Sequence, residues 1–163
     1  MQIGLTRVSL NDVQGGELTS GIVPLSRTRR SFTRGTAAGA VVLSGAATNV
    51  LQVDCGSVVA GDMIIVSCEV GFLADLGAAF AYFFLSLTQG TAIVECADGF
   101  PGFTIGRTRV PLNDLYRGSA CMLCLVTGNG TFLPRIQGYD LLAAGNATEP
   151  SMCALSAAVF YGG

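Results

Sequence analysis

The chain has 163 residues and a net charge of −2, and half of its residues are hydrophobic while only 12% are charged. This apolar excess excludes an intrinsically disordered chain, and the length predicts one domain. All nine basic residues are arginine and histidine is absent, which excludes a Ser-His or Cys-His nucleophile and a histidine-ligated metal. We therefore expect no enzyme. So few charges also predict that other protein chains cover part of the surface.

The N-terminal part of the chain differs in charge from the rest. Residues 1–40 contain five arginines and two acidic residues, whereas residues 41–163 contain four arginines and nine acidic residues. The first part also has weak hydrophobic periodicity and many small residues, which is typical of an extended segment. We predict an extended basic arm over residues 1–38 and a folded body over residues 39–163.

The arm contains one arginine cluster with an aromatic residue, formed by Arg27, Arg29, Arg30, Phe32 and Arg34. Such a cluster can bind nucleic-acid phosphates, pair with carboxylates of a protein, or remain solvated. Since the chain is acidic overall and lacks lysine, a nucleic-acid partner is disfavoured. We expect these five residues to bind a protein partner.

The body consists of β-rich runs separated by turns that contain glycine. Met63 to Phe72 and Met152 to Tyr161 alternate between apolar and more polar residues, which predicts strands with one buried face. Ser119–Thr127 is apolar at nearly every position, which is typical of a central strand that is buried on both faces. About eight strands at regular turn spacing predict an all-β, antiparallel, jelly-roll-like sandwich.

Shorter patterns predict the connections. Ala40–Ser44 and Thr48–Asp54 are short β-rich runs, and Gly128-Asn129-Gly130 predicts a hairpin turn. Asp75–Ala81 has the only helical period, which predicts at most a short helical turn.

Leu76–Val94 has no charged residue and is long enough to cross a bilayer. Its polar interior, its acidic flanks and the turn at Gln89-Gly90 instead favour two strands, Ala79–Thr88 and Thr91–Cys96. The first residues lack the pattern of a signal peptide. We expect synthesis in the cytoplasm and no membrane partner.

Six cysteines allow three interpretations: buried thiols, disulfides or a metal site. Cys121 and Cys124 have half of a zinc-knuckle spacing, but a second close pair is missing and residues three apart on a strand face opposite sides. Reduced, buried thiols are favoured, and we expect no metal and no cofactor. The aspartates fall at turns, where their side chains cap backbone amides; they are Asp54, Asp62, Asp75, Asp98, Asp114 and Asp140.

Two segments carry a family resemblance: LQVDCGSVVAGDMIIVS, which begins at Leu51, and YFFLSLTQGTA, which begins at Tyr82. They resemble the small jelly-roll proteins of tailed-bacteriophage virions, in particular capsid decoration (cement) and head-fibre proteins. The resemblance implies a homotrimer that binds the major capsid protein on the outside of the capsid lattice and strengthens it. It brings no catalytic residues.

We therefore predict a structural virion protein at the capsid surface. The alternative is a receptor- or carbohydrate-binding module of a phage tail or head fibre. Such modules display aromatic residues for sugar stacking, and the absence of tryptophan disfavours one here.

Overall fold

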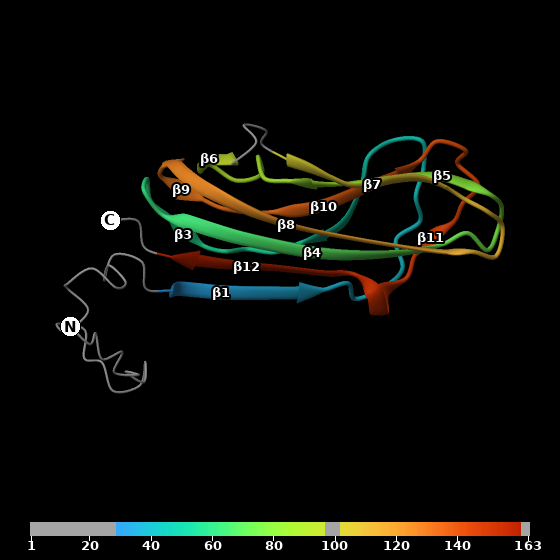
Figure 1. Ribbon diagram of the computed structural model, residues 1–163, viewed down its shortest axis with the longest axis horizontal. Coiled ribbons are helices and arrows are strands. Elements are labelled where there is room, and N and C mark those ends of the chain that lie inside the picture. The colour runs from blue at the N-terminus through green and yellow to red at the C-terminus, as the bar shows by residue number, and fades with distance from the viewer. Residues whose placement is uncertain (1–28, 97–101, 161–163) are drawn as a thin grey trace, which may run out of the picture.

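The computed structural model describes residues 29–96 and 102–160, which form two packed β-sheets and a separate two-stranded sheet of β3 and β9 (Figure 1). The strands are β1 (Arg29–Thr36), β2 (Thr48–Gln52), β3 (Ser57–Val58), β4 (Met63–Leu73), β5 (Ala79–Ser86), β6 (Ile93–Cys96), β7 (Gly102–Val110), β8 (Leu115–Gly128), β9 (Gly130–Thr131), β10 (Arg135–Asp140), β11 (Ala147–Thr148) and β12 (Ala154–Phe160), with a 3-10 helix at Pro150–Met152.

The pairing of the eight longer strands is nested. β5 pairs with β7, β4 with β8, β2 with β10 and β1 with β12, and all four pairs are antiparallel. The large sheet has the order β1-β12-β4-β8-β6, with β11 attached to β4, and the small sheet has the order β2-β10-β5-β7. Eight strands folded in this nested order form a jelly roll, so the predicted fold class is confirmed.

The core lies between the two sheets. The inward faces predicted for the two alternating runs are confirmed on the described residues: Ile64, Val66, Cys68, Val70 and Phe72 on β4, and Cys153, Leu155, Ala157 and Val159 around β12, are all buried. The Phe83 ring packs edge-on against Phe72 and parallel to Tyr116, with centroids 5.8 Å apart in both cases. Gly138 is required beside this cluster, because a Cβ there would lie 2.6 Å from the Phe83 ring.

Part of the predicted arm is a strand of the large sheet. Residues 29–36, assigned to the arm by their charge, form β1, which pairs with β12 from Arg29↔Phe160 to Thr36↔Ala154. This segment therefore belongs to the large sheet, and its strand conformation comes from a partner more than 100 residues away in the chain. Residues 1–28 lie outside the described residues.

Three local predictions were wrong. The turn at Gly128–Gly130 does not form a hairpin, because β9 pairs with β3 instead of β8. Asp75–Ala81 contains a bend followed by the start of β5, without a helical turn. Ala40–Ser44 is not a strand and contributes only an isolated bridge between Val42 and Ala147.

The segment Leu76–Val94 contains β5 in the small sheet and the start of β6 in the large sheet, so its central turn connects two sheets. Across residues 29–96 and 102–160, no helix has the length and apolarity needed to cross a membrane. β1 begins and β12 ends at the same end of the sandwich, on the left in Figure 1.

Candidate assembly surfaces

The outer face of the large sheet is divided into an apolar half and a polar half. Sheet register places Phe32, Ala158, Ile65 and Leu123 in one row across β1, β12, β4 and β8. The next row towards the chain ends contains Phe160, Met63 and Leu125. We call these seven residues the apolar patch.

The patch is open to solvent in the single chain. Phe32 and Leu123 are 53% and 51% exposed, and Leu125 and Ile65 are 45% and 40% exposed. Ile93, on the adjoining edge strand β6, is also exposed. Single exposed apolar residues are common on soluble proteins, whereas a contiguous group on one sheet face marks an interaction site.

Strand β8 corrects one prediction and explains the patch. The apolar run Ser119–Thr127 predicted burial on both faces, but the structure buries only the inward residues Met122, Cys124 and Val126. A strand with this composition is normally covered on both sides. In the single chain, only the inner face of β8 is covered.

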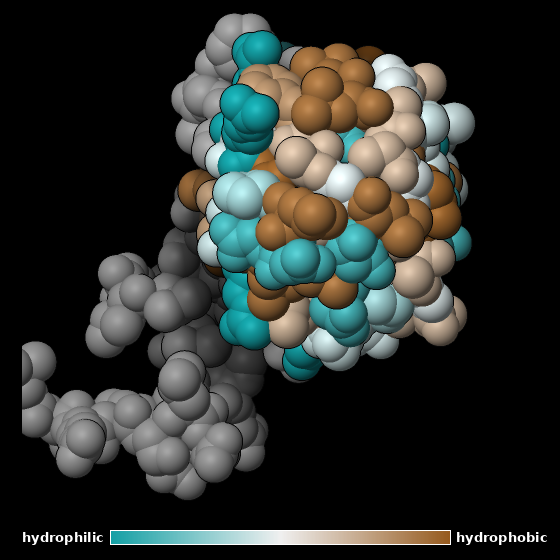
Figure 2. All heavy atoms as spheres, turned by 90° about the vertical axis from the view of Figure 1, so that its right-hand side faces the viewer, coloured by the Kyte–Doolittle hydropathy of each residue, from teal (hydrophilic) through white to brown (hydrophobic). Residues whose placement is uncertain are grey.

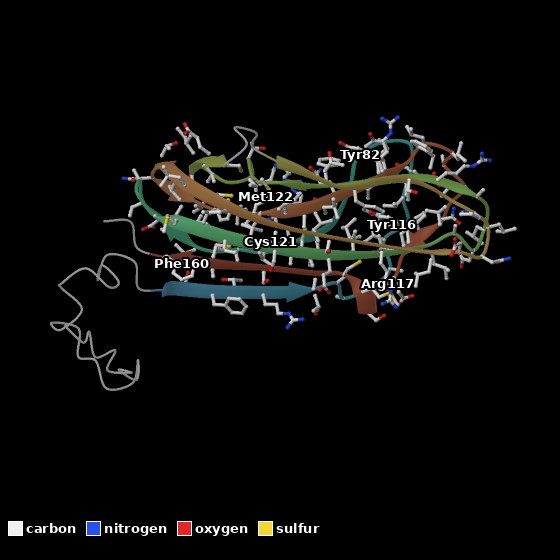
Figure 3. All side chains as sticks on the ribbon, in the orientation of Figure 1. Tyr82, Tyr116, Arg117, Cys121, Met122 and Phe160 are labelled. Atoms are coloured by element: carbon white, nitrogen blue, oxygen red, sulfur yellow. The ribbon has the colours of Figure 1, made fainter. Side chains whose placement is uncertain are left out.

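The other half of the outer face is polar and hollowed. Its rows are Arg34, Ser156, Ser67 and Cys121, then Thr36, Ala154, Glu69 and Ser119. Small side chains on β12 and β4 form the floor of a 470 Å³ hollow, in which the hydroxyl oxygens of Ser67 and Ser156 are 2.7 Å apart. Figure 3 shows Phe160 and Arg117 near opposite ends of this sheet, with Cys121 between them.

The structure brings two of the five predicted arm residues to this face. Phe32 lies in the apolar patch, and Arg34 lies in the adjacent polar row and is exposed. Arg29 and Arg30 belong to β1, but their side chains are outside the described part, and Arg27 lies outside the described residues.

A second apolar surface lies at the opposite end of the sandwich, formed by the loops after β4, β7 and β10. Leu76, Leu112, Leu141 and Leu142 are each more than half exposed there. We call them the leucine loops. Figure 2 faces this end and shows hydrophobic side chains grouped among polar ones.

Two buried polar residues hold these loops. The Asp140 carboxylate accepts hydrogen bonds from the backbone amides of Phe80 (2.9 Å), Leu142 (3.0 Å) and Ala144 (3.3 Å). The Asn146 side chain accepts from the Leu76 amide (2.9 Å) and donates to the Gly77 carbonyl (2.8 Å). Hydrogen-bonded buried groups fix backbone positions, so these bonds hold the loops that carry Leu76, Leu141 and Leu142.

The outer face of the small sheet carries aromatic side chains that pack against one another. The Tyr82 ring lies 5.0 Å from Tyr139 and 5.7 Å from Phe84, and its hydroxyl is 2.8 Å from the Thr104 hydroxyl. The Arg107 guanidinium lies 5.1 Å from the Phe80 ring centroid. These four rings are only partly exposed.

None of the six cysteines forms a disulfide in the structure, but one expectation about them was wrong. Five are buried, whereas Cys121 is exposed on the outer face of the large sheet. Cys121 and Cys124 face opposite sides of β8, as the spacing predicted. Burial raises the pKa of Cys55 to about 12 and that of Cys68 to about 11, so both thiols stay protonated at neutral pH.

The acidic residues serve the turns. Asp54, Asp62 and Asp114 accept hydrogen bonds from the nearby amides of Gly56, Val59 and Leu115. Asp98 lies outside the described residues. Within the described part of the chain, no three cysteine or acidic side chains are grouped as metal ligands.

No protein-family profile matches the sequence, and no curated protein matches it either. Two solved structures are similar at a low level. One is a structure of the infectious bursal disease virus Gx strain, with a TM-score of 0.38 and 14% identity over 84% of this chain and 34% of that chain. The other is the crystal structure of the infectious bursal disease virus VP2 subviral particle, with a TM-score of 0.27 and 12% identity over 81% of this chain and 41% of that chain. The fold assignment above rests on the strand order and register of this chain.

Proposed function

We propose that the protein is a structural subunit of a virus particle, which decorates the outside of a capsid lattice and stabilises it as a homotrimer. One observation carries the proposal: the jelly roll exposes two separate apolar surfaces, the apolar patch and the leucine loops. A decoration protein needs two kinds of contact, one with its sister copies and one with the lattice. The absence of histidine, the side chain used most often in acid–base catalysis, favours a structural role over an enzymatic one.

We assign the apolar patch to the contact between sister copies. Permanent interfaces between copies resemble a protein core divided in two, and β8 has the sequence of a strand that is covered on both faces. The polar row of Arg34 and Cys121 would form the rim of this interface. The leucine loops then face the capsid protein from the opposite end.

The contact between copies is tested by light scattering on two matched variants of one strand. We expect the wild-type mass to correspond to three chains. Leu123→Asp should shift the protein to monomers by weakening association more than about tenfold, because it places an unpaired carboxylate in the interface. Ser119→Asp, on the same face of β8, should retain the trimer. A wild-type monomer at micromolar concentration, or equal effects of the two variants, contradicts the assignment.

The lattice contact is tested on purified virus particles from the source culture. We expect mass spectrometry of these particles to find this chain at a fixed ratio to the major capsid protein. After removal of the bound protein, recombinant wild type should rebind and Leu142→Asp should not, while the neighbouring Ala143→Asp should rebind normally. Absence of the chain from the particles contradicts the proposed function.

The role of the N-terminal segment is tested by a deletion that stops before β1, which begins at Arg29. Removing residues 1–28 should leave the jelly roll folded and weaken particle binding, since this segment contains Arg27 of the predicted arginine cluster. The weakening should grow smaller as salt is added. Removing residues 1–36 should also destabilise the fold, because it deletes the strand that pairs with β12. Unchanged occupancy after removal of residues 1–28 would exclude the segment as an anchor.

The aromatic cluster on the small sheet favours a second candidate, a saccharide-binding module. Partly exposed tyrosine rings with hydroxyls, next to Arg107 and Gln137, offer both stacking and hydrogen bonding to a sugar. Binding to a bacterial polysaccharide panel that is lost in Tyr139→Ala but kept in Leu142→Asp would support this candidate over the lattice contact.

A further inference from the structure

Cys96 and Cys124 form a pair on the inner face of the large sheet. They are direct register partners on the antiparallel strands β6 and β8, and their Sγ atoms are 3.5 Å apart. Both side chains are buried, at 7% and 1% exposure. Directly opposed residues of antiparallel strands have Cα atoms about 4.5–5.5 Å apart, and this range lies within the separation that disulfides require. A disulfide therefore needs only small side-chain rotations here.

From this geometry we propose that Cys96 and Cys124 are an oxidisable pair, reduced in the cytoplasm and joined by a disulfide once the protein is outside the cell. The oxidant is a small-molecule disulfide such as oxidised glutathione. One cysteine thiolate attacks it and releases one glutathione thiolate. The second cysteine thiolate then attacks the mixed disulfide and releases the other. Two protein thiols become one disulfide, one glutathione disulfide becomes two glutathione thiols, and the protons of the protein thiols end on the released glutathione.

The position of β6 explains both the access and the effect. β6 is a four-residue edge strand, and among the described strands it pairs with β8 alone. Local opening of this edge therefore admits the oxidant to the buried thiols. The disulfide would join the edge strand covalently to β8, which carries Leu123 and Leu125 of the apolar patch. The passage from the cytoplasm to the outside of the cell rests on the proposed function, whereas the oxidation of the pair rests on its geometry alone and is tested separately.

The other cysteines provide the controls. Cys121 is exposed but points to the outer face, away from Cys124. The buried Cys153 Sγ lies near the Gly71 carbonyl, and Cys55 is buried near β3 and β9, where its amide bonds to the Phe132 carbonyl. Among the described thiols, Cys96 and Cys124 have the closest Sγ–Sγ contact that the structure records.

The test uses the full-length protein with Cys121→Ser, which removes the exposed thiol and leaves the core intact. The native protein is incubated with oxidised glutathione, the remaining thiols are alkylated in denaturant, and the chain is cleaved after arginine and glutamate. Cleavage after Glu95 and Arg107 isolates Cys96 on residues 96–107, and cleavage after Arg117 and Arg135 isolates Cys124 on residues 118–135. We expect these two peptides to be linked, and the link to disappear on treatment with dithiothreitol.

Two further measurements make the test independent of how any one variant folds. The oxidised protein should melt about 5–10 °C higher than the reduced protein, since the bridge closes a loop of moderate length in the unfolded chain. Cys68→Ala should oxidise as the parent does, whereas Cys124→Ala should not. Full alkylation of all thiols after oxidation, glutathione adducts without a bridge, or a bridge to a different cysteine would overturn the proposal.

Discussion

On the outer face of the small sheet, the rings of Tyr82 and Tyr139 pack against each other, whereas Ile65, Leu123 and Leu125 on the outer face of the large sheet remain open to solvent. Both faces carry apolar residues that point away from the core. The first face covers them with neighbouring side chains of the same chain, so they contribute to the stability of one subunit. The second face leaves them exposed to solvent. They stabilise the protein only when another chain covers them.

The largest expected difference between exposed and covered surfaces is in thiol reactivity. In the free native protein at pH 7, Cys121 on the large sheet should react with a maleimide at least about a hundredfold faster than Cys55 or Cys68, because burial raises the pKa of both buried thiols and so lowers their thiolate fraction. Mass spectrometry should find one fast thiol in the native protein and six in the unfolded protein. Protection of Cys121 in the assembled protein would show that its sheet face is covered, and a second fast thiol would contradict the burial described here.

The second largest expected difference is in how the free energy of unfolding depends on protein concentration after a substitution on each face. Tyr82→Ala should lower the free energy of unfolding by about 2 kcal/mol at every protein concentration, because the lost ring contacts lie within one subunit. Leu123→Ala should change it by less than about 0.5 kcal/mol in dilute solution, and by more as concentration rises and association contributes. Urea unfolding at two concentrations measures both effects. A concentration-independent loss for Leu123→Ala would remove the distinction between the faces.

The smallest expected effect is the loss of the contact between Arg107 and Phe80 on the small sheet. Arg107→Gln should cost about 0.5–1 kcal/mol of unfolding free energy, because it removes a partly exposed cation–π contact with Phe80. Arg109→Gln, on the same strand, leaves that contact in place and should cost less. Equal costs for the two variants would indicate that the contact does not stabilise the sheet.

The sequence predicts those elements whose local pattern matches their final environment. The alternation in β4 and β12 is visible because their inner faces are buried and their outer faces are mixed, so the strands and their core residues were predicted correctly. β1 was missed because Arg, Ser, Thr and Gly dominate it, and its strand conformation depends on β12 at the other end of the chain. No local signal reports such a distant partner.

The candidate surfaces show the same limit. The apolar run in β8 predicts that both faces of the strand are covered. A sequence pattern cannot tell whether the outer face is covered by the same chain or by another one. Leu141-Leu142 followed by Gly145-Asn146 reads as an ordinary loop, and only the hydrogen bonds of Asp140 and Asn146 show that it is rigid. The turn role of Asp140, by contrast, was predicted from its position and is confirmed.

The nested pairing has a consequence for the order of folding. The innermost pair, β5 with β7, closes the shortest stretch of chain, whereas β1 must wait for β12, the last described strand to be synthesised. Because chain closure costs more entropy as the loop lengthens, we expect the sandwich to form from the centre of the sequence outward. β12 lies between β1 and β4, so a nascent chain that stops before residue 154 lacks two strand ladders at once. Ribosome-stalled chains of increasing length should therefore remain protease-sensitive until this strand has emerged.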